Sequence, residues 1–263
     1  MTGIRSERGR IWRITLDRPD ARNAISEPML EELGRALGDA AADPEARIAL
    51  LSGEGPHFCA GADLGELDAD TRGPGGARYE SAFEDVLSGI ADHPLPVMAV
   101  IQGAALGAGC QITVACDLAV AASDATIGIP SSRLGILINF ENVQRLVLSI
   151  GPKRAGEILF TGKPISGETA AVWGLVNEAV PSDRLIARAE ELAEEIAGAA
   201  PLSVRGSKRG IRAVLQKLSI DREGEGFRVA DFDMMAADAF SSEDLKEGVR
   251  AFREKRKPLF RGK

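Results

Sequence analysis

The chain has 263 residues, 44% of them hydrophobic and 27% charged, which suits one large globular domain, or a domain with an appendage, that folds without disulfides or a metal. Its formal net charge of −7 argues against nucleic acid as the main partner. No apolar run reaches the ~20 residues of a membrane span, and the first ten residues lack the apolar core of a secretory signal, so we expect a soluble cytoplasmic protein with no membrane partner.

The N-terminal part of the chain alternates predicted strands and helices. Ile11–Leu16 has the alternation of an edge or half-buried strand. Ser26 is a candidate N-cap, and the leucines after it recur at helical spacing. Short apolar strands are predicted at residues 48–52 and Val97–Ile101. Such an alternation is typical of an α/β protein.

The middle of the chain continues this alternation after one interruption. Residues 68–76, rich in Gly and Asp, are predicted to form a mobile surface loop, and residues 83–90 restore a helical period. Two more strands are predicted at residues 118–121 and 126–129, and a helix at residues 141–149. After residue 182 nearly everything is predicted to be helical. The order indicates an α/β core with a helical C-terminal extension.

Two segments combine very small side chains with a predicted helix start. At residues 107–109 a tight turn leads from a strand into a helix, and Gly61 and Ala62 precede a shorter helix. The first N–H groups of a helix have no intrahelical acceptor, and oriented main-chain donors stabilise negative charge on a carbonyl oxygen. Close packing of a helix on a sheet explains the same residues, so the pattern alone leaves both interpretations open. Phosphate binding is disfavoured, because no Gly-Lys-Ser/Thr follows and Ile112 replaces the third glycine of a dinucleotide fingerprint.

Two motifs favour the first interpretation. Residues 58–64 (Phe-Cys-Ala-Gly-Ala-Asp-Leu) and 103–110 (Gly-Ala-Ala-Leu-Gly-Ala-Gly-Cys) resemble the paired signatures of the enoyl-CoA hydratase/isomerase (crotonase) superfamily. The resemblance covers nearly the whole chain. Further segments similar to the family recur in order at residues 18–19, 23–25, 144–146, 159–162, 173–176 and 252–258.

The resemblance implies an α/β fold, a crotonase-like spiral of ββα units. Residues 1–200 would form the core that binds an acyl-CoA thioester, and residues 201–263 a helical region for oligomerisation and closure over CoA. It also implies a homotrimer or homohexamer and no cofactor apart from the coenzyme A of the substrate. The N–H groups of Ala62 and Ala108 would form an oxyanion hole. The residues implied along the CoA path are Arg22, Ala24, Ala60, Leu64, Phe252 and Lys255.

Phe252 and Lys255 would close over the nucleotide end from a neighbouring subunit. Lys255 is equally well interpreted as a solvated charge, because it lies in a basic run.

The chain departs from the family pattern where the hydratases carry two catalytic glutamates. By resemblance, these positions are Gln111, directly after Gly-x-Gly-Cys, and Ser131, directly after Pro130. A third position, an Asp in the family's dienoyl-CoA isomerases and aryl-CoA dehalogenases, is Asn139 here. None of the three side chains titrates usefully near neutral pH. We therefore expect ordinary hydratase activity to be weak or absent.

Two carboxylates close in sequence are candidate replacements. Glu141 begins a predicted helix, and Glu66 lies on the short helix predicted after Asp63. Each also fits a helix N-terminal glutamate that the dipole favours. We interpret Asp63 itself as a cap that holds the Ala62 loop.

The remaining residues with reactive side chains suggest no second chemistry. The three cysteines have no ligand spacing and are interpreted as small buried thiols. His57 and His93, each near a proline, lie beside no Gly-x-Ser-x-Gly elbow, and no metal site is predicted.

Two hypotheses remain. The first is an enoyl-CoA hydratase/isomerase-like enzyme of fatty acid metabolism, a lyase or isomerase that stabilises a thioester enolate with non-standard proton transfer. The second is a non-catalytic acyl-CoA-binding protein, favoured by the polar but non-ionising residues. For the second hypothesis, the apolar residues 134–138 would hold an acyl tail, although a core loop is the plainer interpretation of them.

Overall fold

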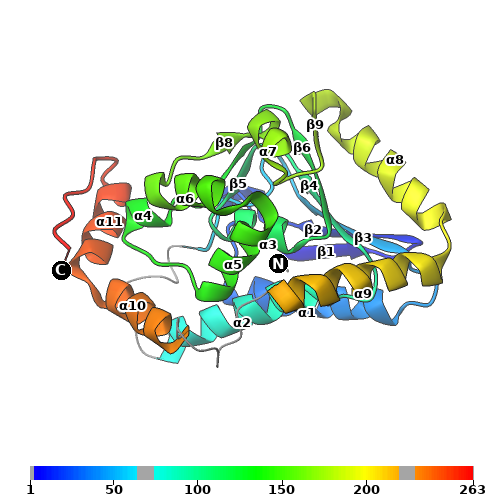
Figure 1. Cartoon of the computed structure of the whole chain (residues 1–263). Coiled ribbons are helices and arrows are strands. Elements are labelled where there is room, and N and C mark those ends of the chain that lie inside the picture. The colour runs from blue at the N-terminus through cyan, green and yellow to red at the C-terminus, as the bar shows by residue number, and fades with distance from the viewer. Residues whose placement is uncertain (1–2, 64–73, 219–228, 263) are drawn as a thin grey trace.

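A computed structural model describes residues 3–63, 74–218 and 229–262 of the chain (Figure 1). Its main sheet has six strands in the order β1-β2-β3-β4-β6-β9. All neighbouring strands in it pair in parallel except β1, which is antiparallel to β2. The strands are β1 (Ile4–Glu7), β2 (Ile11–Leu16), β3 (Ile48–Gly53), β4 (Val97–Ile101), β6 (Leu118–Ala122) and β9 (Glu178–Val180).

A smaller sheet continues from the main one. It consists of β5 (Ala104–Leu106), β7 (Thr126–Gly128) and β8 (Ile165–Ser166) in the order β5-β7-β8. Strand β5 follows β4 after a short turn, and β7 follows β6 in the same way, so each pair of strands spans both sheets before a helix begins. This repetition of strand, strand and helix gives the mixed α/β fold that the sequence predicts.

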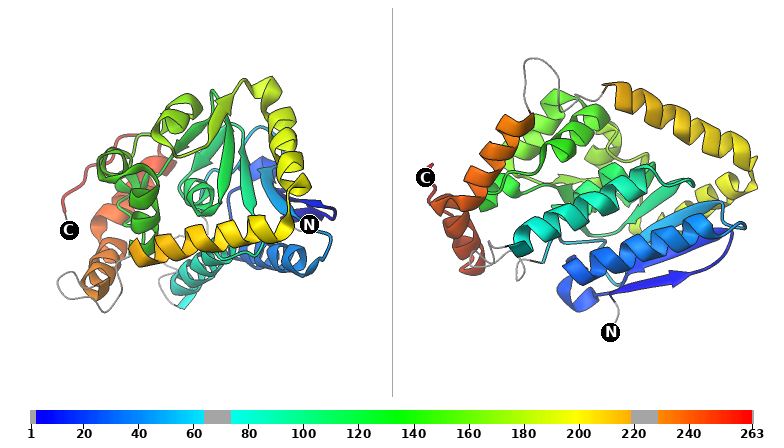
Figure 2. Two further views of the ribbon diagram at one scale, coloured as in Figure 1. Left: turned by 45° about the vertical axis from the view of Figure 1, so that its right-hand side comes forward. Right: turned by 90° about the horizontal axis from the view of Figure 1, so that it is seen from below.

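Helices cover the sheets and close one end of the molecule. Helices α1 (Glu27–Ala42) and α2 (Pro74–Ala91) pack side by side, and α8 (Leu185–Gly198) packs on β2, β3, β4 and β6 (Figures 1 and 2). The other helices are α3 (Ala108–Ala115), α4 (Ser131–Leu134), α5 (Phe140–Ile150), α6 (Pro152–Thr161), α7 (Gly167–Trp173), α9 (Pro201–Leu218), α10 (Val229–Ser241) and α11 (Glu243–Arg253). Within the described ranges, no helix has the combination of length and apolarity needed to cross a membrane.

The core lies between the main sheet and its helices. All five residues of β4 and five of the six in β3 are buried, and their continuous apolar runs are typical of parallel strands covered on both faces. Helix α1 buries one stripe that includes Met29, Leu33 and Leu37. The C-terminal helices pack on this core through contacts of α11 with α4 and of α10 with α5.

Most of the predicted elements are confirmed, with three corrections. Strand β1, which has one partly buried and three exposed residues, occupies the sheet edge, so β2 is an inner strand. The predicted loop at residues 68–76 is too long, because α2 already begins at Pro74. Residues 64–73, where a short helix is also predicted, lie outside the described ranges. The segment before α5 contains the unpredicted helix α4.

Candidate active site

A cavity of about 330 Å³ lies where four parts of the chain meet. They are α2, residues 60–63 (the Ala62 segment), the start of α3, and residues 129–139 before α5. Ala62 and Ala108 both line it, as the sequence predicts. So do the apolar side chains of Leu134, Ile136, Leu137 and Ile138. The structure therefore brings the two small-residue segments and the apolar stretch into one site.

The start of helix α3 lies directly against the backbone of Cys59, and this close approach requires glycine. Gly107 has a φ of +54°, which strains any residue with a Cβ, and its N–H donates to the Gly128 oxygen at 2.9 Å. A Cβ placed on Gly109 would collide with the carbonyl oxygen of Cys59. Ala108 is the first residue of α3, so its N–H has no intrahelical acceptor.

The Ala62 segment is held in place from two sides. On one side Ile25 donates to the Gly61 oxygen at 2.8 Å, and Asp63 donates to the Ile25 oxygen at 2.9 Å. On the other side Leu106 donates to the Cys59 oxygen at 2.9 Å. These bonds do not use the N–H of Ala62.

Two further contacts fix the approach of this segment to α3. The Asp63 carboxylate accepts a hydrogen bond from the Arg18 guanidinium at 2.6 Å, so Asp63 does hold the loop, through an ion pair. A Cβ on Gly107 would lie 3.7 Å from the Gly61 Cα, so the residues preceding Ala62 and Ala108 lie side by side.

Neither the Ala62 N–H nor the Ala108 N–H donates to a protein acceptor in the described part of the chain. Two uncommitted main-chain donors in one cavity can bind a carbonyl oxygen and stabilise negative charge on it. The donors are already oriented by the fold, so little reorganisation is needed when charge develops.

All three polar positions identified from the sequence line the cavity: Gln111, Ser131 and Asn139. Asn139 is the N-cap of α5, where its side chain accepts from the Asn142 N–H at 3.0 Å and donates to Glu84 at 3.3 Å. The side chains of Gln111 and Ser131 make no hydrogen bond within the described residues.

The residues predicted along the CoA path divide into three groups. Arg22, Ala60 and Phe252 line the cavity, and Arg22 and Phe252 are exposed. Ala24 and Lys255 do not line it; Lys255 is exposed just after α11. Leu64 lies outside the described residues.

The two candidate carboxylates are not brought to the cavity by the described structure. Glu141 lies in the first turn of α5 but is not part of the lining. Successive helical residues are rotated by about 100°, so Glu141 lies on a different side of the helix from its neighbour Asn142, which does line the cavity. Glu66 is outside the described ranges.

Sequence reasoning missed several residues that line the cavity, including Asn142 on α5. Three of them, Tyr79, Glu80 and Phe83, come from α2, and Phe240 comes from α10. The Tyr79 and Phe83 rings are stacked with centroids 6.1 Å apart, and the Tyr79 hydroxyl donates to the Ile25 oxygen at 3.3 Å. The i, i+4 spacing of the two aromatic residues on one helix was an available signal.

The thiols near the site are not suited to nucleophilic chemistry. Burial raises the pKa of Cys59 and of Cys110 to about 12, so both stay protonated near neutral pH. Among the described residues, no group of three or more His, Cys, Asp or Glu side chains is arranged to hold a metal ion.

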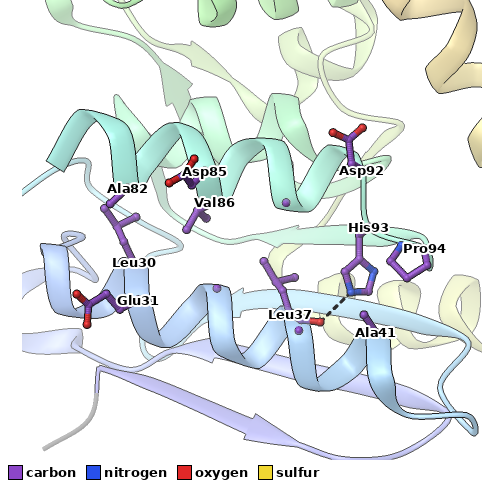
Figure 3. A pocket seen from close by; sticks show the side chains of 13 residues that line it. Leu30, Glu31, Leu37, Ala41, Ala82, Asp85, Val86, Asp92, His93 and Pro94 are labelled. Carbon is purple, nitrogen blue, oxygen red and sulfur yellow. Dashed lines mark hydrogen bonds between the residues drawn. The ribbon is translucent and has the colours of Figure 1, made fainter. Parts of the chain in front are cut away.

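A second hollow, the α1/α2 groove, lies between α1 and α2 (Figure 3). Its volume is about 500 Å³, and Gly34, Gly38 and Gly89 are among the residues that line it. At one end the His93 ring bonds to the Leu37 oxygen at 2.9 Å, drawn as a dashed line in Figure 3.

The family model described as enoyl-CoA hydratase/isomerase matches residues 6–263. The chain belongs to the enoyl-CoA hydratase/isomerase family. The match takes in both small-residue segments and the C-terminal helices, so the resemblance predicted from the motifs is confirmed over nearly the whole chain.

Similar family members include proteins named as hydratases. The chain is 38% identical over 261 residues to the human enoyl-CoA hydratase domain-containing protein 2, mitochondrial, with 96% of this chain and 86% of the relative covered. It is 34% identical over 268 residues to the 2,3-dehydroadipyl-CoA hydratase of Escherichia coli, with 99% and 98% covered.

Solved structures of the family share the fold. A methylmalonyl-CoA decarboxylase in complex with 2-nitronate-propionyl-CoA superimposes with a TM-score of 0.88 at 26% identity, covering 100% of this chain and 99% of that one. An enoyl-CoA hydratase/isomerase from Xanthobacter autotrophicus superimposes with a TM-score of 0.86 at 28% identity, covering 96% and 93%. Decarboxylation and hydration are different reactions, so family and fold do not by themselves identify the chemistry.

Proposed function

We propose that the protein binds an acyl-CoA thioester in this cavity and polarises the thioester carbonyl with the N–H groups of Ala62 and Ala108. The observation that carries this proposal is that two residues with uncommitted main-chain N–H groups, Ala62 and Ala108, line one cavity. Membership of a family whose relatives are named for CoA thioesters supports it.

The cavity lining matches the parts of such a ligand. The apolar stretch from Leu134 to Ile138, with Phe83 and Phe240, suits an acyl chain. Arg22 and Phe252, exposed at the cavity, suit the nucleotide end of CoA. Coenzyme A enters as part of the substrate, and the proposed chemistry needs no other cofactor.

The chemistry that we propose is formation of a thioester enolate, with hydration weak or absent. Hydration requires one group to deprotonate water and another to deliver a proton to the α-carbon. Gln111, Ser131 and Asn139 cannot do this, because amides and a hydroxyl do not titrate usefully near neutral pH. The loss of one general acid or base costs about 10²–10⁴ in rate, and here both hydratase positions are replaced.

We further propose that the protein assembles as a homotrimer or homohexamer through its C-terminal helices. Large apolar side chains on these helices are exposed in the single chain, and Leu202 on α9 is 85% exposed. Exposed apolar surface of this kind marks interaction sites.

The test combines binding, turnover and mass. Crotonyl-CoA and butyryl-CoA should raise the melting temperature, because a ligand that binds only the folded state stabilises it, while free CoA should do so less. Loss of the enoyl absorbance of crotonyl-CoA should be negligible, and light scattering should give three or six times the mass of the chain. Rapid hydration would contradict the proposed loss of hydratase activity. No binding of either thioester would overturn the function itself.

A non-catalytic acyl-CoA-binding protein is the second candidate, favoured by the neutral side chains at the three polar positions. It predicts the same stabilisation by acyl-CoA, but no exchange of protons at the α-carbon of the ligand.

A further inference from the structure

One carboxylate faces the cavity from α2. Glu80 follows Tyr79 in the sequence and precedes Phe83 by three residues. The rings of Tyr79 and Phe83 are stacked, and all three residues line the cavity. Among the described residues of the lining, Glu80 is the only carboxylate. It therefore shares one cavity with the two uncommitted amides of Ala62 and Ala108.

Glu84, one turn further along α2, shows by contrast a carboxylate that is fully engaged. The Glu84 carboxylate forms an ion pair with the Arg145 guanidinium, and one of their hydrogen bonds is 3.0 Å long. It also accepts hydrogen bonds from the Ser88 hydroxyl at 3.0 Å and from the Asn139 side-chain amide at 3.3 Å. These partners hold the Glu84 side chain in place and join α2 to α5. Glu84 does not line the cavity.

The Glu80 carboxylate has no hydrogen bond or ion pair within the described structure. Although the side chain stays accessible to solvent at the cavity, partial burial raises its pKa above the ordinary range of a glutamate. No cationic partner stabilises the charge of the Glu80 carboxylate, which favours its accepting a proton.

We propose that Glu80 is the group that moves protons to and from the acyl chain in this cavity. The inference rests on the proposed function, because it requires a thioester held by Ala62 and Ala108. The role is distinct from the predicted one of Glu141 and Glu66, neither of which is placed at the cavity by the described structure.

The step conserves atoms and charge. The Glu80 carboxylate bonds to a proton of the carbon next to the thioester carbonyl, and the electron pair of the broken C–H bond forms the enolate. The resulting negative charge lies on the thioester oxygen, where the two amides stabilise it. The protonated Glu80 then returns the proton to the same carbon or, in a 3-enoyl thioester, to the fourth carbon of the acyl chain, so that the C=C bond moves next to the carbonyl. One carboxylate suffices for this transfer from carbon to carbon, whereas hydration also needs an activated water.

The experiment measures proton exchange and binding in parallel. The full-length protein is incubated with 3-butenoyl-CoA in D₂O, and deuterium entering the acyl chain is followed by mass spectrometry against a protein-free control. The Glu80→Gln variant should lose about 10²–10⁴ in exchange rate, while its melting temperature and its affinity for butyryl-CoA stay near those of the parent. Glu80→Asp, which keeps a shorter carboxylate, should retain part of the exchange.

The matched control is Asp85→Asn. Asp85 is exposed on the same helix but lines the α1/α2 groove (Figure 3), so its loss should leave exchange unchanged. Should Glu80→Gln prove unstable, Glu80→Asp and Glu80→Ala carry the same comparison.

The outcomes separate this inference from the proposed function. Exchange that is equally fast in the parent and in Glu80→Gln overturns the role of Glu80. Binding of butyryl-CoA without any exchange in the parent also overturns it and favours the non-catalytic binder. Absence of binding overturns the proposed function, and the role of Glu80 with it.

Discussion

The cavity beside Ala62 and Ala108 and the α1/α2 groove both depend on small residues, but for different physical reasons. At the cavity, Gly61 and Gly107 have φ values of +121° and +54°, which side chains rarely allow. In the groove, a Cβ on Gly34, Gly38 or Gly89 would meet nothing within 4 Å. Glycine is thus required by the backbone at the cavity, whereas in the groove it merely leaves space.

The two hollows also differ in the kinds of polar group that line them. The cavity contains two main-chain amides and the Glu80 carboxylate without protein partners among the described residues. In the groove the His93 ring is engaged, since it accepts from the Leu95 N–H at 3.2 Å and bonds to the Leu37 oxygen. The groove is also lined by the carboxylates of Glu31 and Asp85, which have no hydrogen bond or ion pair among the described residues, so neither volume nor an unpartnered carboxylate marks a site. The cavity differs because its carboxylate lies together with two uncommitted main-chain N–H groups.

The comparison is tested most strongly by removing one of the free amides. Ala108→Pro deletes the N–H at the first position of α3, where proline is well tolerated because that N–H has no intrahelical acceptor. Loss of one oxyanion-hole donor typically costs about 10²–10³ in rate. We expect a fall of that size in the deuterium exchange of 3-butenoyl-CoA.

Circular dichroism and thermal melting provide the control for this variant. A folded Ala108→Pro protein that exchanges as fast as the parent would show that the Ala108 amide does not stabilise the enolate. The matched variant Ala108→Gly keeps the N–H and should retain most of the exchange.

The parts of this site that could be predicted from the sequence are those that depend on interactions between residues close together in the chain. The turns at Gly61 and Gly107 depend on local backbone conformation, so the small residues before a helix start indicated these two segments, and the family resemblance then identified the N–H groups of Ala62 and Ala108. Glu80 and Phe240 were missed because they reach the cavity only through the packing of α2 and α10, which a single sequence does not reveal.

Two other errors have equally local causes. Glu141 was a candidate because of its closeness to Asn139 along the chain, but the helical rotation within α5 separates it from the lining. Strand β1 was missed because only one of its four residues is even partly buried, so it lacks an apolar pattern. The division between residues 1–200 and 201–263 stays a prediction, although α9 does begin at Pro201.

The engaged polar group of the groove gives the second prediction. Burial lowers the pKa of His93, and the Lys208 ammonium acts in the same direction. As the pH falls, His93 therefore takes up its proton in the unfolded state before it does so in the folded state. The contribution of neutral His93 to stability is present above the unfolded pKa of about 6.5. It is lost as the pH drops towards the lowered pKa of the folded state.

Urea unfolding of the parent and of His93→Gln at about pH 8 and about pH 5.5 isolates this contribution. The variant should be less stable at the higher pH by about 1–3 kcal/mol, because the Leu95 N–H loses its acceptor, and the gap should narrow at the lower pH. A gap that widens on acidification would show that His93 is protonated in the folded protein. Acyl-CoA affinity should not change in either case.

The smallest effect is expected from filling the groove itself. Gly38 is exposed within α1, and a Cβ there meets no neighbour, so Gly38→Ala should stabilise the protein by about 0.4–1 kcal/mol through helix propensity and the unfolded chain. Gly109→Ala is the matched change at the cavity, and it should destabilise the protein and weaken acyl-CoA binding, since its Cβ collides with the Cys59 oxygen. Chemical unfolding measures both. If Gly38→Ala weakened butyryl-CoA binding, the groove would be coupled to the ligand, and the contrast between the two hollows would be wrong. If butyryl-CoA binding stays unchanged, the requirement for glycine is confined to the cavity.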